Sequence, residues 1–133
     1  MPRLNPASAY QDQAVSTADG PRLLVMICER LSADMARAET AIESWNYPVV
    51  NDNLQHAQGL IRMLRSALDP EGFHGGYELM SVYVFIERHL IKANLEKSVS
   101  VLRECIELFQ PIHDAWVAAV NANERSSSGT FVA

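Results

Sequence analysis

Residues 77–94, YELMSVYVFIERHLIKAN, are apolar on two sides of a helix instead of one. At roughly 100° per residue, the first stripe contains Leu79, Val82, Tyr83, Ile86, Leu90 and Ala93. Met80, Val84 and Ile91 form a second stripe, and Glu87 and Asn94 lie between the two stripes. A surface helix usually has one apolar stripe and a polar back. This helix is therefore either buried on two sides or has one side that receives a partner.

Three other segments repeat apolar residues at alternating steps of three and four, which predicts helices over residues 20–45, 49–68 and 98–120. The stripe of the first of these helices extends to Trp45. Asp19 and Ser98 are suitable N-caps for the first and fourth helices. Pro48 separates the first two helices, whereas Pro111 lies on the polar face of the fourth, where we expect a kink and not a helix end. With mostly short connections, this pattern predicts an all-α, antiparallel up-down-up-down four-helix bundle.

The chain of 133 residues is expected to form one domain with a single core. Residues 19–120 contain the bundle. Residues 1–18 form an N-terminal segment that is either flexible or caps the bundle. Residues 121–133 are small and polar, which predicts a disordered tail.

Composition excludes several functional classes. A net charge of −5 and the lack of a Lys/Arg cluster argue against a nucleic-acid-binding protein. The longest apolar run, residues 23–28, is too short for a membrane span, and the first residues lack the apolar core of a secretory signal. These features predict a cytoplasmic protein. Cys28 and Cys105 lie within apolar helical patterns and are expected to be reduced, inert core thiols.

No motif for catalysis or for a cofactor is apparent. Glu71 and His74 match the Glu-x-x-His unit of di-iron bundles, but they lie in a loop and no second copy exists. Other histidines are isolated, which predicts surface positions and no metal site. Along the first helix, acidic residues including Asp34 alternate with Arg30 and Arg37, as is typical of a solvated face. We therefore expect neither an enzyme nor a cofactor.

The fourth predicted helix is also more apolar than one contact requires. Its apolar arc covers about half of the helix circumference, from Leu108 to Ile106. Burial against two neighbouring helices explains this arc in one interpretation. In the other, an apolar groove beside the third and fourth helices receives an amphipathic helix of a partner.

Several short motifs follow one another in an order known from other proteins. Residues 9–11 (AYQ) and 15–19 (VSTAD) precede the Leu-rich first helix, and Leu68-Asp69 ends the second. The third helix carries the strongest set: Leu79, Tyr83, Phe85, Leu90, Ala93, Asn94 and Leu95. Asp114-Ala115-Trp116 comes last. In this order, over about residues 9–120, the chain resembles the flagellar export chaperone family, the FliS proteins.

The resemblance implies a helical-bundle chaperone of type III flagellar secretion, without a catalytic centre. Such a chaperone binds the C-terminal segment of flagellin, which is disordered in the monomer, prevents premature polymerisation and assists export. An anti-sigma factor, another flagellar regulator or an export-gate component is a further possible partner. A regulatory adaptor is thus the alternative function, and a bundle metalloenzyme is the third hypothesis.

The expected contact residues come from two sources. The second stripe contributes Met80, Val84 and Ile91, and the family motif contributes Tyr83, Ala93 and Asn94. Asn94 fits a helix-terminating position equally well. In the family an N-terminal segment covers part of the binding surface, and here it would contain Tyr10 and Val15. Val84 itself departs from the family, which often has Asp at this position.

Overall fold

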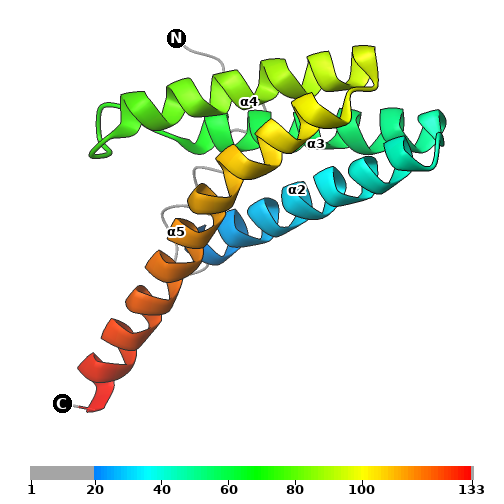
Figure 1. Cartoon of the computed structure of the whole chain (residues 1–133). Helices are drawn as coiled ribbons and strands as arrows, with labels where there is room; N and C mark the ends of the chain where they lie inside the picture. Colours follow the sequence, from blue (N-terminus) through cyan, green and yellow to red (C-terminus); the bar gives the residue numbers. More distant parts are fainter. Residues whose placement is uncertain (1–19, 133) are drawn as a thin grey trace, which may run out of the picture.

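The computed structural model of the chain describes residues 20–132, with side chains for residues 20–125. Its helices are α2 (Gly20–Glu43), α3 (Tyr47–Ala67), α4 (Gly76–Glu96) and α5 (Val99–Val132). Each helix contacts the next along the chain, and α5 also contacts α2, so the four helices form a closed ring (Figure 1). No strand occurs in the described range. The prediction of an all-α four-helix bundle is confirmed.

The ends of the helices follow local chemistry. The Ser98 hydroxyl accepts a hydrogen bond from the Val101 N–H at 3.2 Å, which makes Ser98 the N-cap of α5, as predicted. Pro48 lies in the first turn of α3, where its missing N–H has no helical partner to lose. For this reason α3 begins before the proline and not at residue 49.

The core consists of the stripes that the sequence predicts. On α4 the first stripe is buried or packed against the core along its whole length. The largest fully buried side chains come from all four helices and include Leu31, Met35, Leu54, Ile61, Leu64, Tyr83, Ile86, Leu90, Leu102 and Phe109. The four helices therefore share a single apolar core.

Trp45 departs from its predicted stripe. Helix α2 ends at Glu43, Trp45 takes a left-handed backbone with φ of 63°, and its side chain is 79% exposed. Two backbone hydrogen bonds close the turn: the Trp45 N–H donates to the Ile42 carbonyl at 3.1 Å, and the Asn46 N–H donates to the Ala41 carbonyl at 2.8 Å. Glycine usually occupies the left-handed position of such a turn.

Replacing Trp45 by glycine should therefore raise the free energy of unfolding by about 1 kcal/mol, because glycine adopts positive φ without steric cost. Little packing is lost, since the indole is exposed. Urea denaturation measures the change. Trp45→Ala keeps the backbone strain and should gain less. A less stable glycine variant would show that the indole packs against the protein in solution.

Helix α5 is longer than predicted. It passes through Pro111 and continues to Val132. Three alanines follow Pro111 between residues 118 and 122, and glycine is absent until Gly129, which favours continued helix. Arg22 Nε also donates a hydrogen bond to Glu124 Oε1 at 2.7 Å, which connects the extension to the start of α2.

Helix α5 is longer than the other three helices, so one end of it is not covered by them. With 34 residues against 21 to 24 in the other helices, α5 is about 50 Å long at 1.5 Å per residue. Its C-terminal part runs away from α3 and α4 and extends beyond the start of α2 (Figure 1). At this end, therefore, α5 is not packed against α3 and α4.

Asp34 corrects the prediction of a solvated charged face. Its side chain on α2 is 1% exposed and forms a hydrogen-bonded pair with His56 Nδ1 of α3. Arg30 and Arg37 approach the same carboxylate at 3.5 and 3.6 Å. A buried carboxylate requires such partners, so this cluster fixes the α2–α3 contact. Periodicity alone does not distinguish such a position from a solvated one.

Candidate apolar binding site

An apolar pocket lies where α5 leaves the rest of the bundle. It has a volume of about 360 Å³, and we call it the outer pocket. Its lining comes from the α3–α4 loop, the first turns of α4 and the exposed middle of α5: Phe73, Leu79, Pro111, Ile112, Ala115, Trp116 and Ala119. All seven are apolar apart from the indole N–H, so this pocket suits apolar side chains.

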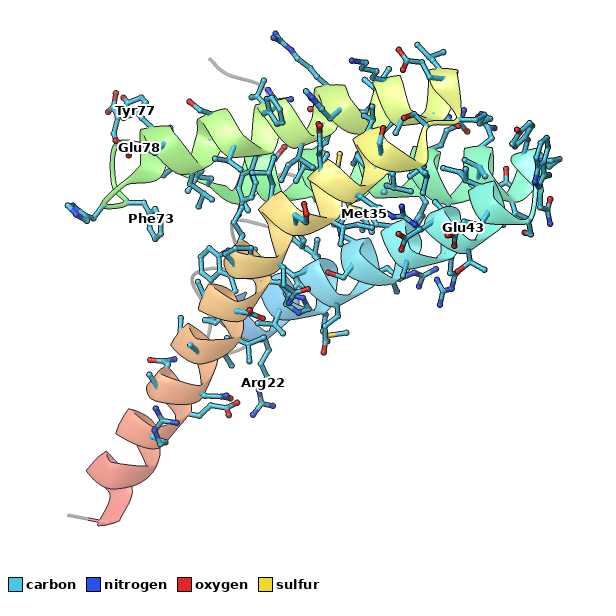
Figure 2. The ribbon with its side chains drawn as sticks, viewed as in Figure 1. Arg22, Met35, Glu43, Phe73, Tyr77 and Glu78 are labelled. Atoms are coloured by element: carbon cyan, nitrogen blue, oxygen red, sulfur yellow. The ribbon has the colours of Figure 1, made fainter. Side chains whose placement is uncertain are left out.

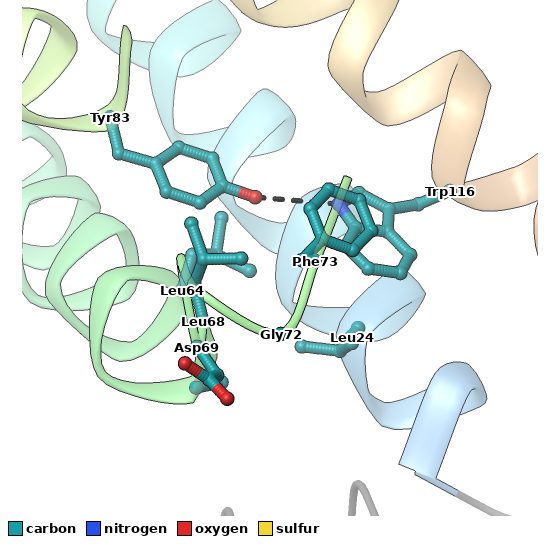
Figure 3. Close-up of a pocket in the computed structure, with 9 residues that line it drawn as sticks. Leu24, Leu64, Leu68, Asp69, Gly72, Phe73, Tyr83 and Trp116 are labelled. Carbon is teal, nitrogen blue, oxygen red and sulfur yellow. Dashed lines mark hydrogen bonds between the residues drawn. The ribbon is translucent and has the colours of Figure 1, made fainter. Parts of the chain in front are cut away.

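A second, smaller pocket adjoins the first and shares two lining residues with it. This inner pocket has a volume of about 190 Å³ and is drawn in Figure 3. Residues from α2, α3, α4, α5 and the loop line it: Leu24, Leu64, Ala67, Leu68, Asp69, Gly72, Phe73, Tyr83 and Trp116. Phe73 and Trp116 belong to both pockets.

Phe73 and Trp116 form the wall between the two pockets. Their rings stack with centroids 6.1 Å apart and an interplanar angle of 19°. Trp116 Nε1 donates a hydrogen bond to the Tyr83 hydroxyl at 3.3 Å, drawn as the dashed line in Figure 3. Burial raises the pKa of Tyr83 to about 12, so the phenol stays protonated at neutral pH. Trp116 is thereby held by the core, whereas Phe73 belongs to the loop.

The loop that carries Phe73 folds back on itself. The Glu71 N–H donates to Asp69 Oδ1 at 3.2 Å, and the Gly76 N–H donates to the Phe73 carbonyl at 2.8 Å. Gly75 has φ of 75°, a conformation that other residues rarely adopt. A Cβ on Gly76 would lie 2.4 Å from the Pro70 carbonyl oxygen, so only glycine allows this close approach. From this folded loop Phe73 extends toward α5, apart from Tyr77 and Glu78 (Figure 2).

The second stripe of α4 lies on a different surface. Met80 and Val84 are half-buried and Ile91 is exposed. Glu87, between the two stripes, accepts a hydrogen bond from Arg62 Nε of α3 at 2.9 Å and also pairs with Arg65. The second stripe therefore flanks α3, whereas the two pockets lie against α5. The structure does not bring these two sets of residues together.

The residues taken from the family motif lie inside the bundle. Tyr83, Ala93 and Asn94 are all buried. Asn94 Nδ2 donates to Asn51 Oδ1 of α3 at 2.9 Å, and α4 continues past Asn94 to Glu96. Lys97, with φ of 51°, provides the left-handed end of the helix, so Asn94 does not terminate it. Tyr10 and Val15 lie outside the described residues.

Sequence reasoning did not identify Phe73, Pro111 and Ala119 as site residues. One signal was available, because Phe73 is a large apolar residue within the polar, glycine-rich segment of residues 69–76. Pro111, Ala115 and Ala119 are also spaced by four, which places small apolar residues along one line of a helix. That line, once α5 is seen to leave the bundle, forms the floor of the outer pocket.

The two thiols are protected within the core. Cys28 and Cys105 are both fully buried, and burial raises the pKa of each thiol to about 12. Both stay protonated at neutral pH and lack the thiolate that acts as a nucleophile.

We therefore expect neither Cys28 nor Cys105 to react with an aromatic disulfide reagent at pH 8 in the native protein. Two thiols per chain should become reactive when guanidinium chloride unfolds the protein, as measured by absorbance. One rapidly modified thiol under native conditions would contradict this burial.

The described residues include His, Cys, Asp and Glu side chains of the kinds that bind metal ions. No group of three or more His, Cys, Asp or Glu side chains is arranged to hold a metal ion among them. Glu71 and His74 lie in the loop, as predicted, and Glu71 accepts a hydrogen bond from the Tyr77 hydroxyl at 3.2 Å. Within the described range, no helix combines the length and the hydropathy needed to cross a membrane.

Fold and site together define a class: a helical-bundle protein with an open apolar pocket beside a projecting helix. Comparison with known families makes this more specific. Residues 3–123 match the family described as "Flagellar protein FliS", and the chain belongs to this family.

Curated relatives have the same name, "Flagellar secretion chaperone FliS". The Bacillus subtilis (strain 168) protein is 27% identical over 126 residues, which cover 95% of this chain and 94% of the relative. The Escherichia coli (strain K12) protein is 29% identical and covers 79% of each chain. The Vibrio cholerae El Tor protein is 26% identical over 79% of this chain and 78% of its own length. The predicted family is confirmed.

Proposed function

We propose that this chaperone acts in the cytoplasm, binds the C-terminal segment of flagellin, prevents its premature polymerisation and assists its export. The single observation that carries the proposal is the apolar outer pocket beside α5 in a chain of the flagellar secretion chaperone family. A segment that is disordered when alone loses conformational entropy on binding, and burial of apolar side chains offsets that loss.

An amphipathic helix from the partner fits this surface. The middle of α5 supplies one wall, and the loop with the start of α4 supplies the other. Such a helix would bind its apolar side chains between the walls and leave its polar face in water. Under this proposal, Tyr83 holds Trp116 at the pocket from within and does not contact flagellin.

The second stripe of α4 is proposed as a further contact. Val84→Asp should leave helix content and the melting temperature nearly unchanged, because Val84 is only half-buried at the outer flank. Affinity for the flagellin segment should fall, since a carboxylate resists burial in an apolar interface. Calorimetric titration and circular dichroism measure the two effects. A large loss of stability would assign Val84 to the core and remove this stripe from the binding surface.

Co-purification tests the proposed partner. Flagellin should be retained by the tagged chain, and deletion of the flagellin C-terminal segment should abolish retention. Retention of the truncated flagellin would contradict the proposal. The alternative function, a regulatory adaptor for an anti-sigma factor, predicts that the purified regulator binds and displaces flagellin.

A further inference from the structure

We propose that Phe73 is a lid: it separates the two pockets in the free protein and moves aside when one large apolar side chain of the partner helix enters. This inference rests on the proposed function, which supplies the partner helix. It adds a specific site, the inner pocket, and a residue that controls passage between this pocket and the outer one. The expected occupant is a leucine or aromatic side chain.

The inner pocket has the size and chemistry for such an occupant. Its volume of about 190 Å³ exceeds that of engineered apolar cavities of about 150 Å³ that bind benzene. Leu24, Leu64 and Leu68 form much of its wall. The Tyr83 hydroxyl already receives the Trp116 N–H, and Asp69 already receives the Glu71 N–H. Asp69 is the single charged residue of a mostly apolar lining, so an apolar side chain is favoured over an anionic one.

Phe73 is the part of the wall that is able to move. Trp116 is tied to the core through Tyr83, but the Phe73 ring is 42% exposed and lies on a loop. In the described residues, every hydrogen bond of the loop is made within the loop or to the ends of α3 and α4, and none reaches α2 or α5. The ring stack on Trp116 is therefore the contact that holds the loop tip against α5.

Two glycines, Gly72 and Gly75, form the proposed hinge on either side of Phe73. Gly72 precedes Phe73 and Gly75 follows it by two residues, and Gly75 already uses a backbone region open to glycine. The base of the loop stays in place, because Gly76 packs directly against the Pro70 backbone. Rotation of residues 72–75 would carry Phe73 away and join the inner pocket to the outer one.

Removal of the ring tests the lid directly. In Phe73→Ala the two pockets should form one continuous site in all molecules, so apparent affinity for an apolar ligand should rise by about fivefold or more. The first probe is the uncharged dye N-phenyl-1-naphthylamine, followed by fluorescence. The second is a synthetic C-terminal segment of flagellin, followed by calorimetry. Phe73→Trp, which keeps a large ring, should not show the increase.

Phe85→Ala is the matched control. Phe85 is 43% exposed, stacks on His89 of its own helix at 3.7 Å and lines neither pocket. Its loss should leave dye and segment binding unchanged. Unchanged dye binding in Phe73→Ala, or weaker binding of the segment, would overturn the lid. Stronger dye binding without binding of the segment by either protein would support the lid and contradict the proposed partner.

Discussion

Replacement of Trp116 by alanine should weaken binding of the flagellin C-terminal segment by about 30-fold or more. Trp116 lines both pockets and is held by Tyr83, and the loss of a well-packed aromatic anchor at an interface commonly costs about 2 kcal/mol or more. Calorimetric titration measures the affinity, and circular dichroism shows that the variant remains a folded helical bundle.

Trp45→Ala provides the control for this experiment. Trp45, the second tryptophan of the chain, is more exposed than Trp116 but lies in the α2–α3 turn, at the opposite end of the bundle from the α3–α4 loop. Its replacement should leave affinity within about threefold of the wild type, as is usual for residues outside the energetic centre of an interface. Equal losses in the two variants would mean that the cleft beside α5 is not the binding site.

Replacement of Phe109 by alanine should have the largest effect on stability, with a loss of about 3–5 kcal/mol in the free energy of unfolding. The side chain is 0% exposed and is among the largest fully buried groups of the core. Its truncation removes buried apolar surface and leaves a cavity that the helices fill only in part. Urea denaturation, followed by circular dichroism, measures the change.

Leu108→Ala is the natural comparison, since it removes a large apolar side chain from the adjacent position. Leu108 is 40% exposed, so its truncation should cost less than about 1 kcal/mol. Together the two variants test the direction in which α5 faces the core. Similar losses at both positions would contradict the orientation of this helix.

Periodicity was sufficient for the fold. Steps of three and four placed Tyr83, Ile86 and Leu90 on one face of α4, and all three are buried as predicted. The Ser98 cap of α5 also followed from local chemistry, whereas the predicted Asp19 cap lies outside the described residues. These features depend on short-range spacing, which a sequence contains in full.

The site depends on contacts that local spacing does not encode. Phe73 of the α3–α4 loop stacks on Trp116 of α5, although the two residues are 43 positions apart in the chain. Asp34 was expected in solvent, and its burial depends on His56 from the next helix. Trp45 is the last residue of the predicted helical pattern, but α2 ends two residues earlier, at Glu43. The first two differences arise where tertiary contacts override a local pattern, whereas the third is a local turn that apolar spacing does not reveal.

The most direct test of the proposed binding site uses the two tryptophans of the chain. Each contributes one indole N–H resonance to a nitrogen–proton correlation spectrum, and the Trp45 and Trp116 variants assign the two peaks. When the flagellin C-terminal segment is added, the Trp116 resonance should shift or broaden, and the Trp45 resonance should stay in place. Binding that moves only the Trp45 resonance, or neither one, would contradict a site in the apolar pockets beside α5.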